Sequence, residues 1–438
     1  MATAAVERTA ERAGIVVTGV GAVSPAGLGH QALWDAVRGG RVTTGAVTRF
    51  DTSRHPSHRA GEIPRSALSR LDSLVPPHRS LAARCLAAAA AEAAHGAGLT
   101  RTGRLTRTGR LTRTGRLTRT AGFTRTEGGA RTGVFAGTVM GTRPVLDHGI
   151  TSAGLTAEGT DWAEPARLLD LVPEVVPVDG PVVLLASGCS VGGDAVACGA
   201  AAISEGEVDV AICGGAEELS QEVFAMFTTL RALAPDVARP FDDDRLGMQP
   251  AEGAAVVILE SAEHCAARGG LPLAVLLAHG AAADAYHLTR PRPTGDALVE
   301  AIGTCLRDAG RAPEDIDWVC AHGTGTPASD GVEARAIVSA LGGPGRRRPA
   351  VSSLKGMLGH TQGAAGVLEA VVAVLAMAAG HLPGNATLRR PDPACAGLDL
   401  VPPWGREAPV ATVLSLAFGL GGGVSALLLG AAGGDDEA

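Results

Sequence analysis

Residues 181–206 read PVVLLASGCSVGGDAVACGAAAISEG, and the fold class follows from them. The apolar start at 181–187 predicts a strand, a glycine-flanked turn then carries Cys189, and the Ala-rich run at 191–205 predicts a helix. Another apolar strand, VDVAICGG, follows at 208–215. Strands this apolar are typical of a sheet covered by helices on both faces, so the sequence predicts an α/β fold.

The second half of the chain repeats this alternation. Its predicted elements are a helix at 297–310, a strand at 316–323, a helix at 330–341, a strand at 350–354, an apolar helix from Gly363 and two strands at 412–418 and 423–430. In each half a strand delivers a reactive side chain, Cys189 or His322, to a turn rich in glycine. Two such halves facing one another would bring these turns together. We expect an N-terminal half at 13–262 and a C-terminal half at 270–430.

The composition indicates a globular enzyme with a core of small residues. Of the 438 residues, 46% are hydrophobic and only 3% aromatic, so the core must consist mainly of Ala, Val and Leu. The 60 glycines predict close approaches between helices and strands. A formal net charge of -7 argues against general nucleic-acid binding, which favours a basic face.

Cysteine usage and the apolar stretches predict a cytoplasmic protein. The eight cysteines show no CxxC or Cys/His ligand spacing, which predicts reduced thiols and no metal site. The N-terminal MATAAVERTAERAG lacks the apolar core of a signal peptide. The longest apolar run, 363–380, carries Glu369 and is predicted to be a buried core helix rather than a membrane span.

A repeat interrupts the N-terminal half. The hexamer TRTGRL occurs three times from Thr100, and degenerate copies continue to Gly129. Arginine at every third position makes no amphipathic helical face, so 100–129 is predicted to be a flexible, Arg-rich insert. A tolerated surface expansion is the simpler interpretation, and docking of an acidic partner is the alternative.

Cys189 is a candidate nucleophile. It stands at the start of a predicted helix, where the helix dipole and unpaired N–H groups favour the thiolate and lower the thiol pKa. The strand–turn–helix context resembles a nucleophile elbow built with cysteine. A cysteine in this position can also be a small buried filler.

Two histidines give the cysteine a chemical context. His322 lies in VCAHGTGTP and His360 in LKGMLGHTQGAAG, each beside glycines that allow a substrate to approach closely. Either histidine alone is more often structural. Together with Cys189, they form a triad of the kind used in nucleophilic catalysis, and the combination is far more specific than any one member.

These residues resemble the β-ketoacyl-acyl-carrier-protein synthases, the condensing enzymes of the thiolase superfamily. The resemblance runs from about residue 14 to 429 and is carried by VTGVGAVSPAG, the Cys189 turn, DVAICGGAEE, RPFDDDR, AEGAAVVILE, DAYHLTRPRPTG, AHGTGTP, SSLKGMLGHTQGAAG and AFGLGGG. It implies a five-layered αβαβα thiolase fold made of two duplicated halves.

The resemblance also implies roles for the site residues. Cys189 would carry an acyl group as a thioester, and malonyl-acyl carrier protein would lose carbon dioxide to give the enolate that attacks it. His322 and His360 would stabilise the enolate oxygen. The N–H groups of Cys189 and Leu420 would form the oxyanion hole, with Phe418 and Leu420 at the gate. No bound cofactor is implied, because the substrates are carried on the phosphopantetheine of the carrier protein.

Lys355, the only lysine in the chain, lies five residues before His360. Its position in the matching motif implies a supporting cation beside His360, paired with Asp330 or Glu333. The alternative is an ion pair that only ties two loops together. Thr324, Thr326 and Thr289 match positions that hydrogen-bond the pantetheine arm. These three are the implied pantetheine-binding residues.

The chain departs from the family pattern in two motifs. Where many relatives have FGFGGTN, residues 418–424 read FGLGGGV, so Leu420 replaces an aromatic gate. Where they have RDGF, residues 245–248 read RLGM. These differences favour a specialised polyketide-type ketosynthase over housekeeping fatty-acid elongation.

Two alternatives to a condensing enzyme remain open. One is a non-catalytic chain-length-factor subunit of a heterodimer, and the other is an acyltransferase that uses the cysteine without decarboxylation. The expected partners are an acyl carrier protein and a second subunit, identical or of the chain-length-factor kind. Neither nucleic acid nor a membrane is expected.

Overall fold

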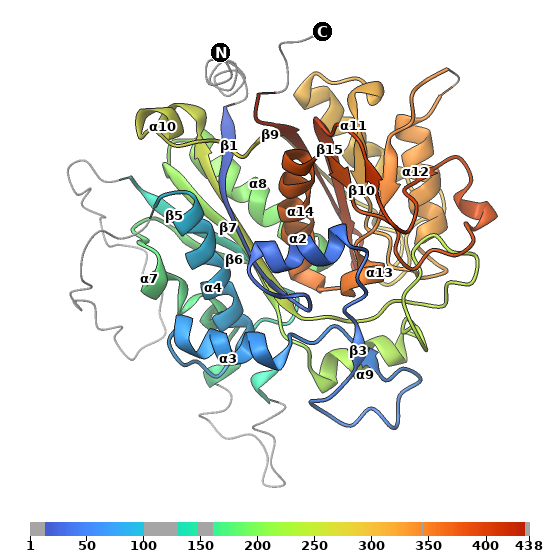
Figure 1. Ribbon diagram of the computed structural model, residues 1–438, viewed down its shortest axis with the longest axis horizontal. Helices are drawn as coiled ribbons and strands as arrows, with labels where there is room; N and C mark the ends of the chain where they lie inside the picture. The colour runs from blue at the N-terminus through green and yellow to red at the C-terminus, as the bar shows by residue number, and fades with distance from the viewer. Residues whose placement is uncertain (1–13, 100–129, 147–160, 344, 434–438) are drawn as a thin grey trace.

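The fold is built on strands that lie buried inside the molecule (Figure 1). The computed structural model describes residues 14–99, 130–146, 161–343 and 345–433, so the repeat at 100–129 and the flexible insert predicted there lie outside the described residues. The strands of the N-terminal half are β1 (Ile15–Ser24), β2 (Gly27–Leu28), β3 (Gly45–Ala46), β4 (Arg59–Ala60), β5 (Thr132–Gly137), β6 (Val182–Leu185), β7 (Val210–Glu217) and β8 (Gly253–Ser261). Those of the C-terminal half are β9 (Ala274–Ala283), β10 (Trp318–Cys320), β11 (Ala350–Ser352), β12 (His381–Leu382), β13 (Asp399–Leu400), β14 (Arg406–Glu407), β15 (Thr412–Phe418) and β16 (Gly423–Ala431).

The two halves of the chain have the same strand order. Among the described residues, twelve strands form one sheet, in which the N-terminal half runs β6-β5-β7-β8-β1 and the C-terminal half runs β11-β10-β15-β16-β9, extended by β13. The directions also agree: β5 is parallel to β6 and β7, as β10 is to β11 and β15. Both halves end in antiparallel pairs, and they join where β1 pairs with β9. This correspondence is what a duplicated α/β unit predicts.

Helices complete a five-layered arrangement (Figure 1). The helices are α2 (His30–Arg38), α3 (Arg65–Leu74), α4 (Leu81–Gly96), α7 (Val172–Val175), α8 (Val191–Ser204), α9 (Gln221–Thr229), α10 (Ala262–Ala267), α11 (Asp296–Ala309), α12 (Asp330–Leu341), α13 (Lys355–Leu358) and α14 (Ala365–Ala379). Helix α4 covers the outer face of the N-terminal strands, and α11 covers the C-terminal ones, with α12 packed beside it. Helices α8 and α14 pack on each other and contact strands of both halves. They form the central layer, and the predicted αβαβα fold is confirmed.

The predicted elements agree with the observed ones to within a few residues. The helix predicted from Gly363 is preceded by a short 3₁₀ turn, η4 (Gln362–Ala364), so α14 itself begins at Ala365. The stretch Gln362–Ala379 has the length and hydropathy of a membrane span, but 78% of it is buried inside the protein. It is the core helix that the sequence predicts. The division into domains at 13–262 and 270–430 stays a prediction.

Other sequence expectations concern the surface and the cysteines. All eight cysteines are free thiols, and all but Cys198 are buried.

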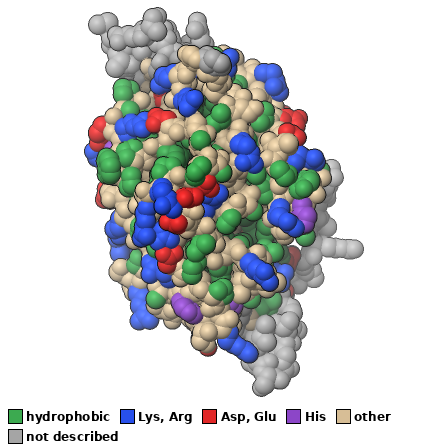
Figure 2. All heavy atoms as spheres, turned by 90° about the vertical axis from the view of Figure 1, so that its right-hand side faces the viewer, with side chains coloured by type: hydrophobic (Ala, Val, Ile, Leu, Met, Phe, Trp, Pro, Cys, Tyr) green, Lys and Arg blue, Asp and Glu red, His purple; other side chains and the backbone are tan. Residues whose placement is uncertain are grey.

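Figure 2 shows one face of the molecule, on which hydrophobic side chains are interspersed with basic and acidic ones. The described residues of this face therefore carry charges of both signs.

Glycine lets the central strands approach their outer helices closely. A Cβ at Gly19 or Gly21 in β1 would lie 2.1 Å from a carbonyl oxygen of α4. The equivalent strand of the other half uses the same device, since a Cβ at Gly280 in β9 would lie 2.1 Å from the Ala301 oxygen in α11. Such distances are far below van der Waals contact, so any side chain would push the helix off the sheet.

We predict that Gly21→Ala destabilises the protein by about 2–3 kcal/mol or more, because the new methyl group meets helix backbone rather than a movable side chain. Gly96→Ala is the matched control. Gly96 is the last residue of α4, the helix that Gly21 packs against, and a Cβ added there would have nothing within 4 Å. Its effect should stay within about 0.5 kcal/mol. Urea denaturation measures both, and equal stability of Gly21→Ala and wild type would contradict the close packing of α4 on β1.

Candidate active site

Cys189 lies between a strand and a helix. Strand β6 ends at Leu185, the 3₁₀ turn η2 (Gly188–Ser190) contains Cys189, and α8 follows at once. Gly188 has a φ of 81°, in the left-handed region that favours glycine, so the chain can turn sharply just before the thiol. The strand–turn–helix context predicted for Cys189 is confirmed.

The turn between β15 and β16 packs directly against Cys189. A Cβ at Gly419 would lie 2.6 Å from the Cys189 nitrogen and 3.1 Å from its Cβ, so the approach requires glycine. The next residue, Leu420, hydrogen-bonds to the thiol through its backbone. This places a backbone N–H beside the sulfur, where an oxyanion hole would need one.

The two histidines share a pocket with Cys189. His322 follows β10, His360 follows α13, and their ring centroids lie 5.2 Å apart in an edge-to-face arrangement. The Phe418 ring is 4.4 Å from that of His322. The pocket has a volume of about 710 Å³, and Cys189, both histidines, Phe418 and Leu420 line it. The two halves therefore bring their reactive turns together, as their pattern predicts.

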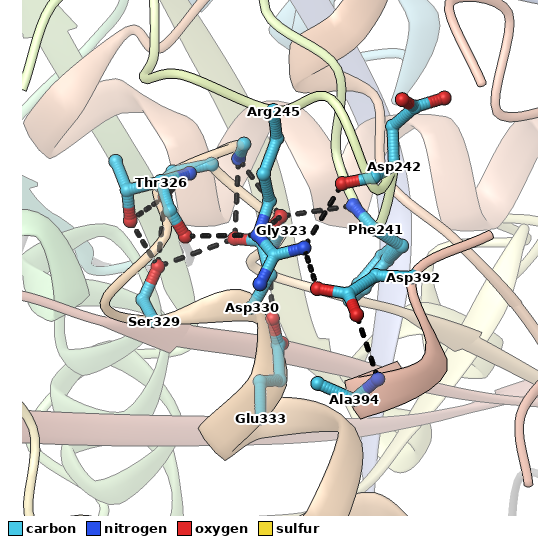
Figure 3. A network of polar contacts seen from close by, with 12 residues as sticks. Phe241, Asp242, Arg245, Gly323, Thr326, Ser329, Asp330, Glu333, Asp392 and Ala394 are labelled. Atoms are coloured by element: carbon cyan, nitrogen blue, oxygen red, sulfur yellow. Dashed lines mark hydrogen bonds and ion pairs between the residues drawn. The ribbon is translucent and has the colours of Figure 1, made fainter. Parts of the chain in front are cut away.

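Two carboxylates at the start of α12 hold the segment that follows His322 (Figure 3). Glu333 accepts hydrogen bonds from the N–H of His322, at 2.7 Å, and from that of the next residue, at 2.8 Å. Asp330 accepts from the N–H of Gly325, at 3.1 Å, and from that of Phe241, at 2.9 Å. Both acids are fully buried. They fix the backbone that carries His322.

Arg245 connects this segment to two other loops (Figure 3). Its Nη1 donates to the Asp242 carbonyl, at 2.9 Å, and to the Asp392 carboxylate. Its Nε donates to the Thr326 carbonyl, at 3.3 Å, and lies 4.0 Å from Asp330 Oδ2. The partners are spread from residue 242 to 392, which is why the sequence alone does not reveal this network.

Lys355 forms a buried ion pair with Glu369, whose side chain projects from α14. The two side chains are only 3% and 2% exposed. The prediction that Lys355 pairs with Asp330 or Glu333 is wrong, because backbone N–H groups of the His322 and Phe241 segments engage both carboxylates. The sequence did hold a signal for Glu369, since a lone carboxylate in an apolar helix needs a buried partner.

Both histidines are held in the neutral form. Burial lowers the pKa of His322 well below its usual value, and the charge of Lys355 and the ring of His360 lower it further. Burial and then Lys355 lower the pKa of His360 in the same way. The Gln362 N–H donates to His360 Nδ1 at 3.2 Å, so the neutral ring carries its proton on Nε2 and can donate it in a hydrogen bond.

The Cys189 thiol is also held in its neutral form. Burial raises its pKa to about 12, and the nearby Glu217 adds to the shift, while Lys355 and the Leu420 backbone oppose it. The expectation of a stabilised thiolate is therefore wrong for the free protein. Helix α8 does begin beside the sulfur, but the loss of hydration on burial raises the pKa of the thiol more than the helix dipole lowers it.

The threonines expected at the pantetheine arm line the same pocket. Thr289, Thr324 and Thr326 all contribute to its wall. The hydroxyls of Thr324 and Thr326 lie 3.0 Å apart, and Ser329 hydrogen-bonds to both of them. Their role in binding stays a prediction.

Among the described residues, no group of three or more His, Cys, Asp or Glu side chains is arranged to hold a metal ion.

We predict that alkylation of Cys189 by iodoacetamide accelerates about tenfold per pH unit between pH 7 and 10, without a plateau. Only the thiolate reacts, and its fraction rises with pH until the pKa of about 12 is reached. Peptide mass spectrometry reports the rate at this residue, with half-buried Cys198 as the internal comparison. A rate that levels off near pH 7 would show instead that the helix dipole dominates.

Comparisons with known proteins agree with this geometry. The family model described as β-ketoacyl synthase, N-terminal domain, matches residues 12–264, and the one for the C-terminal domain matches 273–389. A putative polyketide β-ketoacyl synthase 1 of Streptomyces halstedii is 34% identical over 95% of this chain and 97% of its own length. The 3-oxoacyl-acyl-carrier-protein synthase 2 of Coxiella burnetii is 32% identical over 96% of this chain and 99% of its own.

Solved structures show the same relationship. The ishigamide ketosynthase/chain length factor matches with a TM-score of 0.83 at 32% identity, over 95% of this chain and 99% of that one. A type II polyketide ketosynthase in complex with its acyl carrier protein matches with a TM-score of 0.81 at 25% identity, over 95% and 99%. Together with the thiolase-type architecture and the Cys–His–His pocket, these matches place the chain in the β-ketoacyl synthase family.

Proposed function

We propose that this chain is a β-ketoacyl-acyl-carrier-protein synthase that joins a malonyl unit to an acyl group held on Cys189, in polyketide or specialised fatty-acid biosynthesis. The observation that supports this most strongly is one pocket lined by a thiol and two neutral histidines, with the buried Lys355 close enough for its charge to lower the pKa of both rings. Decarboxylation makes a carbanion equivalent, and such a site needs neutral hydrogen-bond donors rather than strong acids that would protonate it.

In the first step, the acyl group moves from the carrier thiol to Cys189. The Cys189 sulfur attacks the carrier-bound thioester, the carbonyl oxygen becomes negative, and the N–H groups of Cys189 and Leu420 receive it. The carrier's sulfur leaves and takes up the proton that the cysteine loses. Because the resting thiol is neutral, its proton must be removed during the attack.

In the second step, malonyl-carrier protein loses carbon dioxide and its enolate carbon attacks the Cys189 thioester. The electrons of the breaking carbon–carbon bond move onto the malonyl thioester oxygen, which His322 and His360 hold through N–H donors. A new carbon–carbon bond forms, and the Cys189 sulfur leaves as a thiolate that takes up one proton from solvent. The products are carbon dioxide, a β-ketoacyl carrier protein and the free enzyme.

Lys355 acts on this reaction through the histidines and is a positioning residue. Its charge lowers the pKa of both rings, so it helps to keep them neutral at the pH of the reaction. The competing view is that the pair with Glu369 only stabilises the fold. Removing one partner leaves a buried charge alone, whereas removing both leaves none, so the two views can be separated.

We predict that Lys355→Met costs about 3–5 kcal/mol of stability, and that Lys355→Met/Glu369→Leu recovers most of it. Condensation should stay lost in the double variant, because the charge beside the histidines is still missing. Urea denaturation and product formation measure the two effects separately. Full activity of a stable double variant would leave the ion pair with an architectural role alone.

The mouth of the pocket suits a carrier protein. Arg231, Arg290 and Arg292 contribute to its wall together with Thr289, Thr324 and Thr326. The threonine hydroxyls and backbone groups could hold the pantetheine arm along the channel, and the arginines could meet acidic groups of the carrier. Leu420 at the inner end is smaller than an aromatic gate, which leaves more room beside Cys189.

A second subunit would fit the open edge of the sheet. Among the described strands, β6 pairs only with β5, and Val182 in β6 is 47% exposed. Unpaired strand edges are templates for another strand. The edge lies just before Cys189 in the chain, so a subunit bound here would sit next to the active-site turn.

We predict that Val182→Lys weakens association at least tenfold, because a charged side chain would have to be buried at the joined edge. Leu271→Lys is the control, since Leu271 is 72% exposed elsewhere. Sedimentation velocity is run on the chain alone and with a co-expressed chain-length-factor-like subunit. Unchanged association of Val182→Lys in both settings would exclude this edge as the interface.

The reaction itself is tested with acyl-carrier and isotope-labelled malonyl-carrier substrates. We predict carbon dioxide release and a β-ketoacyl product for wild type, and loss of product by at least about 10³-fold for Cys189→Ala. Acylation of Cys189 without carbon dioxide release would indicate an acyltransferase. An absence of labelling would indicate a non-catalytic subunit.

A further inference from the structure

A second cavity, of about 360 Å³, lies behind the active-site loops. Its wall is formed by residues 42–44 just before β3, by Arg59 in β4, and by the segments 237–239 and 386–389. Among the described residues, none lines both this cavity and the pocket of Cys189. The two are therefore distinct sites.

The cavity wall is strongly cationic. Three of its described side chains, Arg59, Arg239 and Arg389, are arginines, and none is acidic. Asp236 pairs with Arg239 from outside the wall, and the carboxylates of Asp242 and Asp244 also lie close enough to act on Arg239. Arg59 Nη2 donates to the Thr44 carbonyl, at 2.7 Å, which holds that guanidinium in place. The side chains that line the cavity itself thus carry only positive charge, and the balancing carboxylates lie outside the lining.

Buried donors in this wall have no partner. Within the described part of the chain, Thr44 Oγ1, Arg59 Nε and Arg239 Nε are buried and make no hydrogen bond. Thr44 is 5% exposed and Arg239 is 6% exposed. An unpaired buried donor costs about 1–3 kcal/mol, so the residues that form this wall hold three donors whose hydrogen-bonding capacity is unused.

We propose that this cavity is a binding site for a phosphate group, either free or as a small phosphate monoester. A phosphate offers three acceptor oxygens and close to two negative charges, which suits several guanidinium donors and a hydroxyl better than a carboxylate does. Arginine is suited to such recognition because its planar donors can bind two oxygens at once. The volume leaves room for a small substituent on the phosphate.

The cavity lies against all three segments that support the histidines. A Cβ at Gly325, beyond His322, would lie 3.0 Å from the backbone nitrogen of Arg239. A Cβ at Gly359, just before His360, would lie 3.2 Å from Thr44 Cγ2. Beside Lys355, a Cβ at Gly356 would lie 2.4 Å from Thr387 Oγ1. A phosphate bound here would thus stabilise the segments that pack directly against the loops of His322 and His360.

The test is isothermal titration calorimetry of the full-length protein with sodium phosphate at constant ionic strength. Sodium acetate and sodium chloride serve as comparators, and glycerol 3-phosphate distinguishes a monoester from the free ion. We expect phosphate to bind at least tenfold more tightly than acetate. Binding should weaken at least tenfold in Arg59→Met and in Arg389→Met. Equal affinity for acetate and phosphate, or no binding of either phosphate compound, would overturn the proposal.

Three further variants locate the site. Arg390→Met is the matched control, because Arg390 is next in the chain but pairs with Asp243 and Asp244 outside the cavity. Thr44→Val should lower phosphate affinity without destabilising the anion-free protein, since it removes a hydroxyl that has no partner. If Arg290→Met abolishes binding while Arg389→Met does not, the phosphate binds at the mouth of the Cys189 pocket and the proposal fails. None of these results depends on the condensation reaction.

Discussion

The buried ion pair between Lys355 and Glu369 is the interaction on which the rest of the site depends. An ammonium group is expensive to bury, and it persists here because a carboxylate from the neighbouring helix meets it where both side chains are almost fully enclosed. The same enclosure lets its field reach the two histidines with little screening. Burial and the field of Lys355 both disfavour an imidazolium, so the two rings remain hydrogen-bond donors without charge. A chain otherwise supplied with arginine keeps its only lysine at this point.

Close packing of the two halves brings the reactive groups near the charge of Lys355. The duplicated halves meet along β1 and β9, and the central helices α8 and α14 contact both halves. Glycine allows the backbone to come within reach at each junction, most directly where Gly419 rests on Cys189. Behind the loops, Asp330, Glu333 and Arg245 fix the backbone rather than touch substrate (Figure 3). The cavity lined by Arg59, Arg239 and Arg389 lies on the far side of the same loops. Charged side chains therefore pack against these loops from two directions.

Much of this arrangement can be predicted from the sequence. The apolar strands and Ala-rich helices give the order of elements, and the spacing of the motifs places Cys189, His322 and His360 at the ends of strands and helices. Two features cannot be read this way. The partner of Lys355 depends on how α13 lies against α14, which brings in Glu369. The position of Lys355 in its motif favours Asp330 and Glu333 instead, but both carboxylates accept hydrogen bonds from backbone N–H groups. The protonation state of Cys189 depends on the burial of its thiol and on the charge of Glu217, which both raise the pKa, whereas the helix start visible in the sequence indicates the opposite shift.

Burial and the charge of Lys355 keep both pocket histidines, His322 and His360, neutral. Nitrogen-15 NMR of histidine-labelled protein, with His322→Gln and His360→Gln used to assign the signals, measures this directly. We expect neither ring to take up a proton near pH 6.5, where an ordinary histidine titrates, because burial and Lys355 lower both pKa values well below that range. Titration of either ring close to that ordinary value would contradict it.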